Sequence, residues 1–210
     1  MSEAPPDAAS QGSTISQAKS VLRARLRQAN RARSGEECAA ASRLLCERIR
    51  ATDLWREAVS VMGFHPMPDE PDVLPLLELA VDLGKQLALP RFDPVSGTYS
   101  PFRIKSLGLD LVKGAYGIGE PAPHCLAVSK SSLDLILIPG VGFDLTLSRL
   151  GRGRGYYDRM LSTMSGIKCG VAFDWQVESS LPKEPHDVSL DGVMTPTRWL
   201  RSMSDSEKCS

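Results

Sequence analysis

Glycines and arginines alternate in one stretch of this sequence, immediately before a predicted helix. Glycine lets backbone N–H groups approach a phosphate closely, and the start of a helix adds partial positive charge. Arginine supplies a planar set of donors that matches phosphate oxygens. Asp158, one turn into the helix, stands where a carboxylate can hold a metal ion that bridges phosphates. The alternating residues are Gly151, Arg152, Gly153, Arg154 and Gly155.

Two interpretations of this loop are open from composition. The first is phosphate binding. The second is an Arg-Gly loop that is solvated or contacts RNA, with Asp158 merely favouring the helix N-terminus. The loop is not a P-loop, because no Gly-Lys-Ser/Thr sequence ends it.

The elements around the loop predict an α/β fold. The most apolar run, 133–138, indicates a central strand of a parallel sheet, and ligands of such sheets bind where strands end. Segments with the hydrophobic pattern of a strand alternate with segments that have the pattern of a helix, which predicts two β-α-β units. We therefore expect a single-domain layered fold with a mostly parallel central sheet flanked by helices. The first unit is 58–64, 72–83 and 86–89; the second is 133–138, 155–163 and 169–173, with a short strand near 99–104.

Helices are expected to precede the sheet. Residues 1–14 are rich in Ala, Pro and Ser and predict a disordered tail, after which Ser16 is a plausible N-cap. Ser34 begins a second helix, and Glu37 has the spacing of a capping box. Asp72 is the expected cap of the helix that follows the first strand. The domain is predicted over 15–201, and 202–210 is a polar tail.

Composition limits the class of protein. The 210 residues hold 25 Lys/Arg and 25 Asp/Glu, so the total charge implies no polyanionic partner. No apolar run is long enough to span a membrane, and the start lacks the features of a signal peptide, so we expect a cytoplasmic protein with no membrane partner. Five scattered cysteines without a C-x-x-C pair predict neither a disulfide framework nor a zinc site.

The long motif Pro139–Asp158 carries a specific resemblance. Pro-Gly-Val-Gly-Phe-Asp followed by Arg-Leu-Gly-Arg-Gly-Arg-Gly-Tyr-Tyr-Asp resembles the signature of the 5-formyltetrahydrofolate cyclo-ligase family. The similarity spans roughly residues 16–197. Further segments that fall in the family's order are Ala18–Arg23, Pro66–Glu70, Leu89–Arg91, Gly117–Pro121, Ala172-Phe173 with Gln176, and His186-Asp187 with Asp191.

The resemblance implies a ring closure that depends on ATP and Mg²⁺. In this family ATP phosphorylates the formyl oxygen of 5-formyltetrahydrofolate, N10 attacks the activated carbon, and phosphate leaves to give 5,10-methenyltetrahydrofolate. The protein's task is then mainly positioning and charge stabilisation. The implied partners are these small-molecule substrates and no nucleic acid, and the implied state is a monomer.

The resemblance also assigns site residues. Lys19 and Arg23 match the nucleotide-contacting pair, and their i, i+4 spacing places both on one helix face. Asp158 and Asp187 match the two magnesium carboxylates; without the resemblance, Asp187 would be a turn residue. The other residues of the implied ATP site are Arg149, Gly151, Arg152, Gly153, Arg154, Gly155, Tyr156 and Tyr157.

The implied folate site consists of His65, Glu70, Arg152 and Tyr156, of which Arg152 and Tyr156 are the expected catalytic residues. Glu70 can accept hydrogen bonds from the donor edge of a pterin. From the residues alone, Glu70 could equally be a charged loop residue and His65 a plain strand-end histidine. The tyrosines could stack on a flat ring or belong to the core.

Two departures from the family pattern concern the same region. Arg154 stands where members often have Lys or Gly, and Leu145–Ser148 replaces a polar turn with what we expect to be a more apolar hairpin.

Two rival functions are a pseudo-enzyme that senses nucleotide or folate and an RNA-binding protein. Lys19, Glu70 and Asp158 are all present, which weighs against the first rival.

Overall fold

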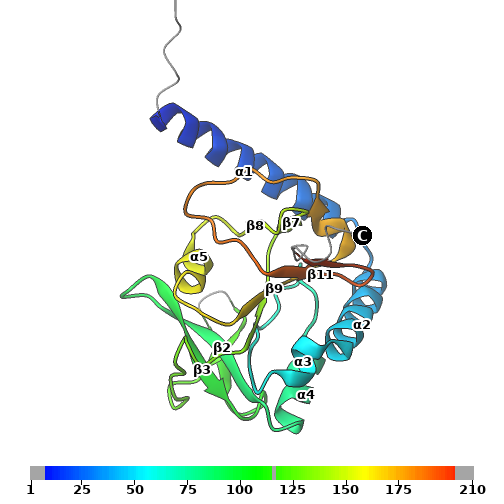
Figure 1. Ribbon diagram of the computed structural model, residues 1–210, viewed down its shortest axis with the longest axis vertical. Coiled ribbons are helices and arrows are strands. Elements are labelled where there is room, and N and C mark those ends of the chain that lie inside the picture. Colours follow the sequence, from blue (N-terminus) through cyan, green and yellow to red (C-terminus); the bar gives the residue numbers. More distant parts are fainter. Residues whose placement is uncertain (1–7, 115–116, 202–210) are drawn as a thin grey trace, which may run out of the picture.

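A seven-stranded sheet runs through the computed structural model of the chain, which describes residues 8–114 and 117–201 (Figure 1). Its strand order is β12-β11-β9-β6-β1-β2-β3. The inner strands pair in parallel, and only the pairs β2–β3 and β11–β12 are antiparallel. The strands are β1 (Ser60–Met62), β2 (Gln86–Asp93), β3 (Thr98–Ile104), β6 (Leu135–Ile138), β9 (Ile167–Val171), β11 (Gly192–Met194) and β12 (Trp199–Arg201).

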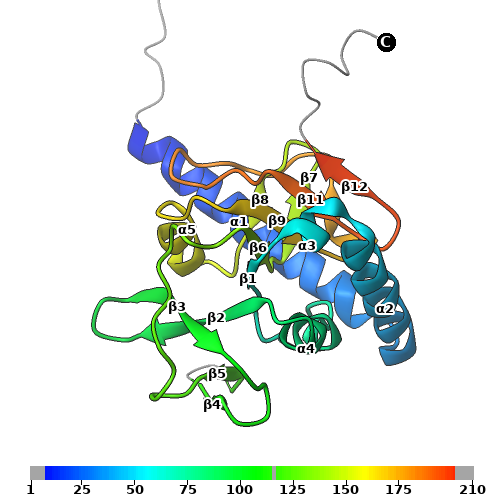
Figure 2. The ribbon, with the colours of Figure 1, turned by 60° about the horizontal axis from the view of Figure 1, so that its bottom comes forward.

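Two small sheets and five α-helices complete the described fold. The strands β10-β7-β8 form one small sheet and β4-β5 the other. Figure 2 shows that the β2–β3 hairpin and the β4–β5 pair extend from one side of the molecule. The small-sheet strands are β4 (Leu111–Lys113), β5 (Gly119–Pro121), β7 (Gly142–Asp144), β8 (Arg149–Leu150) and β10 (Val177–Glu178). The helices are α1 (Ala8–Arg31), α2 (Gly35–Ala51), α3 (Asp53–Glu57), α4 (Leu74–Asp82) and α5 (Tyr156–Leu161), with a 3₁₀ turn at Asp174–Gln176.

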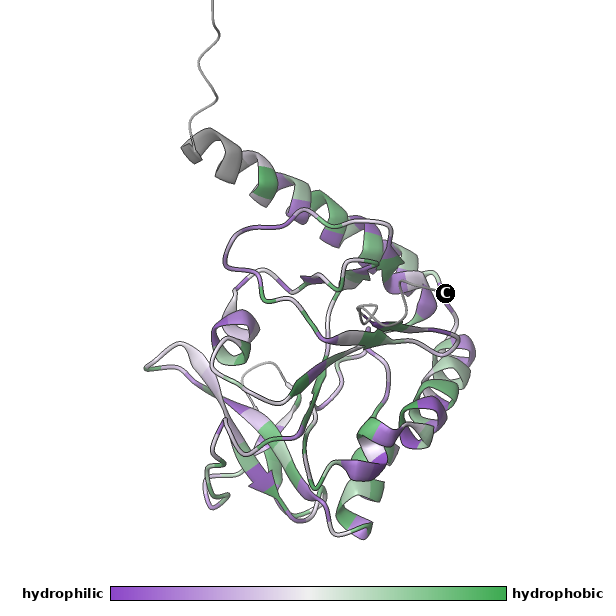
Figure 3. Ribbon diagram, in the orientation of Figure 1, coloured by the Kyte–Doolittle hydropathy of each residue, from purple (hydrophilic) through white to green (hydrophobic). Residues whose placement is uncertain are grey.

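The core lies on both faces of the large sheet because successive strand residues point to opposite sides. In β6, Leu135 and Leu137 join the cluster that contains residues of α2, α3 and α4. Ile136 and Ile138 join the opposite cluster, which contains Met160 of α5. Apolar residues accordingly concentrate on the inner strands and on the inward sides of the helices (Figure 3). This two-sided burial explains the uninterrupted apolar run.

The predicted fold class is confirmed. The sheet is mostly parallel, helices flank it, and β6 lies at its centre between β1 and β9. The capping box is also present, because the Ser34 hydroxyl accepts from the Glu37 N–H and the Glu37 carboxylate accepts from the Ser34 N–H. A longer strand than expected forms at Gln86–Asp93, because it pairs with β3 along its whole length.

Two predicted helix starts were wrong. Helix α1 begins at Ala8 and includes residues 8–14 of the expected tail, so Ser16 is not an N-cap. Helix α4 has Val73 as its N-cap, although the Asp72 carboxylate still accepts from the Leu74 N–H at 3.0 Å. The expected tail 202–210 lies outside the described residues, and the domain limits 15–201 stay a prediction.

Asp144 anchors the turn between β7 and β8. Its carboxylate is 1% exposed, and its Oδ1 accepts from the N–H groups of Thr146 and Ser148 at 2.8 and 2.9 Å. Oδ2 accepts from the Leu181 N–H at 2.8 Å. The turn carries the buried Leu147 at φ 63°, a backbone region that is uncommon for non-glycine residues. The expected apolar hairpin is thus partly confirmed, since Leu147 enters the core.

Replacing Asp144 by Asn tests this anchor. The NH₂ group of Asn would replace one of the two oxygens that accept from backbone N–H groups, so donor would face donor. We therefore expect the free energy of unfolding to fall by about 2–3 kcal/mol. The melting temperature should fall by about 5–10 °C for a domain of this size. Asp53→Asn is the control, because its side chain is 77% exposed. Equal melting temperatures for the two variants in thermal denaturation would contradict the anchor role.

Candidate active site

One cavity opens at the edge of the sheet where β1 and β6 end. Segments that are distant in the sequence meet there, as expected for the carboxyl edge of parallel strands. The loop after β8 and the start of α5 form one wall, and β5 forms another. The lining residues used below are His65, Glu70, Pro90, Tyr99, Glu120, Arg149, Gly151, Arg152, Arg154, Gly155, Tyr156, Tyr157 and Asp158.

The glycine loop adopts backbone conformations that favour glycine. Gly153 has φ 107° and Gly155 has φ 64°, so a side chain at either position would be strained. Arg23 of α1 fixes the loop from outside the cavity, because its Nε donates to the Gly151 carbonyl at 2.8 Å. A Cβ on Gly153 would lie 3.5 Å from the Arg23 guanidinium carbon. The loop is therefore closely packed against α1.

Arg149 lies under the loop and is 7% exposed. Its Nη2 donates to Asp158 Oδ1 at 2.9 Å, and its Nη1 donates to the Pro139 carbonyl at 3.2 Å. Its Nε has no hydrogen-bond partner among the described residues. A buried donor without a partner is costly, so this side of the guanidinium is suited to an anionic ligand.

Arg152 is paired with two adjacent carboxylates. Its Nη2 donates to Glu70 Oε1 at 2.8 Å and also contacts Asp69. The second oxygen of Glu70 accepts from the Met67 N–H at 3.0 Å. Burial raises the pKa of Glu70, and this outweighs the Arg152 guanidinium and the Met67 N–H, which act to lower it. The predicted folate carboxylate is thus tied to the predicted catalytic arginine.

Lys19 forms a second charged group outside the cavity. Its Nζ lies 2.6 Å from both Glu184 Oε2 and Asp187 Oδ2, and the lysine is 5% exposed. Burial acts to raise the pKa of Asp187, but the Glu184 N–H and the Lys19 ammonium outweigh it and leave that pKa below its ordinary value. Oxygen atoms of Asp187 and Glu184 are hard ligands of the kind Mg²⁺ prefers, so the donor set fits that ion.

The tyrosines of the motif belong to an aromatic wall. The Tyr156 ring lies 4.9 Å from Phe92, and the Tyr157 ring lies 5.5 Å from Tyr99, measured between centroids. Burial, with the Glu70 carboxylate adding to it, raises the pKa of the Tyr157 hydroxyl. Both alternatives for these residues therefore hold in part, because the rings pack on the core cluster and also line the cavity.

The structure brings most predicted site residues to one cavity but not all. Lys19, Arg23, Gly153 and Asp187 do not line it, and Asp158 and Asp187 each have a different cationic partner. Sequence reasoning missed Asp69, Tyr99, Glu120 and Glu184. Asp69 is adjacent to Glu70, and Glu184 lies three residues before Asp187, so closeness in the sequence to a predicted site residue was a weak signal for both. Glu120 lies in a segment that carried the resemblance but received no role.

Charge pairing bears on the RNA alternative. The Arg149 side chain is 4% exposed, and Arg152 is bound to carboxylates rather than to solvent. An Arg-Gly tract that binds RNA along its backbone needs free cationic side chains. The arrangement of Arg149 and Arg152 suits a small ligand inside the cavity better.

Comparison with known proteins agrees with this geometry. The sequence model of the 5-formyltetrahydrofolate cyclo-ligase family matches residues 15–196. The 5-formyltetrahydrofolate cyclo-ligase of Mus musculus is 32% identical over 86% of this chain and 95% of its own length. The enzyme of that name from Escherichia coli K12 is 34% identical over 67% of this chain and 80% of its own length.

A solved structure gives the same result. The 5,10-methenyltetrahydrofolate synthetase of Aquifex aeolicus superposes with a TM-score of 0.79 at 31% identity, over 91% of this chain and 99% of that one. Among the described residues, no helix is long and apolar enough to cross a membrane. Sequence, fold and site agree: the chain belongs to the 5-formyltetrahydrofolate cyclo-ligase family, whose members are ligases.

Proposed function

We propose that the protein converts 5-formyltetrahydrofolate to 5,10-methenyltetrahydrofolate, with ATP consumed to ADP and phosphate and Mg²⁺ required. The observation that carries the proposal is the single cavity that collects Glu70, Arg149, Arg152 and Tyr156 beside the glycine loop. Part of the cavity lining is aromatic, which suits a pterin, and part carries the guanidinium groups of Arg149 and Arg152, which suit phosphates. Described residues of a single chain line the cavity, and we propose that the protein acts as a monomer.

Arg149 and Arg152 are assigned to charge stabilisation. As the formyl oxygen bonds to phosphorus and the bond to ADP breaks, negative charge is carried by the phosphoryl oxygens and develops on the oxygen that leaves with ADP. Preorganised donors stabilise that charge most when they need not reorient. The Asp158 and Glu70 carboxylates hold both guanidinium groups in position. ATP would activate the formyl oxygen as a leaving group, and Mg²⁺ would be held by Asp158 and by Asp187 with its neighbour Glu184.

Lys19 and Tyr156, the second expected catalytic residue, are assigned to orienting the substrates. Lys19 already faces two carboxylates, and it would be shared with the phosphates of a bound nucleotide. Tyr156 contacts Phe92 on one side and lines the cavity, so its ring can orient a flat substrate so that N10 reaches the formyl carbon.

Asp158→Asn tests the charge network. The variant removes a carboxylate from Arg149 and from the proposed metal site, so turnover should fall by about a hundredfold or more, and more Mg²⁺ should be needed for half-maximal rate. Initial rates measured across a Mg²⁺ titration check this. Asp82→Asn, an exposed change at the end of α4, is the control. Turnover at the wild-type level would remove Asp158 from the mechanism.

Glu70→Gln tests the folate pocket. The amide keeps the shape of the side chain but weakens its hold on Arg152 and on the pterin donors, so the KM for 5-formyltetrahydrofolate should rise about tenfold with the fold intact. Asp69→Asn is the matched comparison, because Asp69 also binds Arg152 but does not line the cavity. We expect a smaller change in KM for Asp69→Asn. Steady-state kinetics that show no change for Glu70→Gln would move the pterin pocket elsewhere.

A further inference from the structure

Glu120 is a buried acidic side chain in the cavity wall that the proposed reaction does not use. It lies in β5, is 6% exposed, and is one of the residues that line the cavity. Its Oε1 is shielded from solvent and has no hydrogen-bond partner in the part of the chain that the structure describes. A carboxylate oxygen buried without a partner is unfavourable unless a ligand completes its hydrogen bonding.

The surroundings of Glu120 do not neutralise it. Oε2 accepts a long hydrogen bond of 3.3 Å from the Phe92 N–H. Within the described ranges, no Lys, Arg or His nitrogen lies within 4.0 Å of its carboxylate. Glu70 differs in both respects, since Arg152 and the Met67 N–H occupy both of its oxygens. Of the three carboxylates among the described residues that line the cavity, Glu70 and Asp158 are paired with arginines and Glu120 is not.

The local backbone accommodates this side chain. A Cβ on Gly114 would lie 2.4 Å from both Cγ and Cδ of Glu120 and 2.7 Å from its Oε1. Only glycine at that position leaves room for the carboxylate where it is. The Glu120 side chain thus packs closely against the backbone at Gly114, the residue after β4.

The chemistry of the ligand follows from the acceptor. Phosphate groups are acceptors and would be repelled by a carboxylate, so Glu120 does not suit the phosphate side of the cavity. A reduced pterin carries N–H and amino donors along its edges, and a carboxylate oxygen accepts from such groups. Tyr99 and Tyr156 line the same cavity and offer flat surfaces for the ring.

We propose that Glu120 is a second substrate-binding carboxylate, whose free oxygen accepts a hydrogen bond from an N–H group of the pterin ring of 5-formyltetrahydrofolate. The proposal rests on the proposed function. An adenine amino group offers the same donor chemistry, so the test separates the folate from the nucleotide.

The test is Glu120→Gln, assayed by steady-state kinetics with each substrate varied in turn and by thermal denaturation without ligand. The KM for 5-formyltetrahydrofolate should rise about ten- to hundredfold, the scale of a lost hydrogen bond to a charged group. The KM for ATP and kcat should stay within about twofold, because an interaction equal in ground and transition states affects KM alone. The melting temperature should stay equal or rise, because the variant removes a buried charge without a partner.

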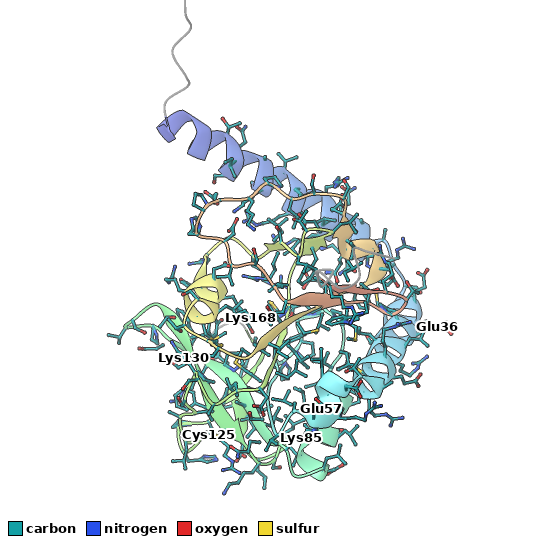
Figure 4. The ribbon with its side chains drawn as sticks, viewed as in Figure 1. Glu36, Glu57, Lys85, Cys125, Lys130 and Lys168 are labelled. Carbon is teal, nitrogen blue, oxygen red and sulfur yellow. The ribbon has the colours of Figure 1, made fainter. Side chains whose placement is uncertain are left out.

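Two further variants complete the experiment. Glu57→Gln is the matched control, because Glu57, labelled on α3 in Figure 4, is exposed and does not line the cavity. Glu120→Asp keeps the charge and withdraws it by one methylene, so it should also raise the KM for folate, and it replaces Glu120→Gln if that variant does not fold.

The outcomes separate the two proposals. An unchanged KM for folate in the folded Glu120 variants, or a change confined to the KM for ATP, overturns the role of Glu120 while the wild-type activity stands. A wild-type protein that neither binds nor converts 5-formyltetrahydrofolate overturns the proposed function, and the role of Glu120 falls with it.

Discussion

The pairing of two arginines with carboxylates from other segments is the interaction on which the rest of the site depends. Arg149 binds Asp158, and Arg152 binds Glu70 together with Asp69. Burying a cation without a partner is strongly unfavourable, so these pairs allow the loop to place positive charge inside a cavity. The Arg152 pairs also connect the loop to the segment after β1.

The same pairs determine how a ligand competes for the site. A phosphate that binds Arg149 shares the guanidinium with Asp158, and Lys19 is shared in the same way with Glu184 and Asp187. A cation held by those carboxylates would replace part of the charge that the arginine and lysine supply. We therefore expect an anion and a cation to bind together more tightly than either alone, which is the charge balance that the proposed reaction with ATP and Mg²⁺ requires.

Local patterns in the sequence predicted the elements and the loop, while contacts between distant segments escaped prediction. The capping box at Ser34 and the apolar strand β6 follow from spacing and burial within a few residues. The motif shared with the family marked the glycine loop and its arginines. The start of α1 at Ala8 was missed because its first residues are small and polar, a composition that resembles a tail.

Roles that depend on partners across the fold could not be predicted. Asp144 belongs to the motif, yet its carboxylate anchors a turn and Leu181 rather than any ligand. Glu184 belongs to the charged group only through its contact with Lys19 of α1, which is 165 residues away in the sequence. Glu120 Oε1 lacks a hydrogen-bond partner because the described segments packed around it offer it no donor, and the spacing of residues in the sequence does not predict which donors meet in the fold.

The most direct test of the central claim is the absorbance of 5,10-methenyltetrahydrofolate in the near ultraviolet, followed with 5-formyltetrahydrofolate, ATP and Mg²⁺ present together and with each omitted in turn. The cavity as described predicts an increase that requires all three. Folded protein that binds ATP and gives no increase would contradict the ligase assignment and favour a protein that senses its ligands instead. An increase that persists without ATP would contradict the roles given to Arg149 and Arg152.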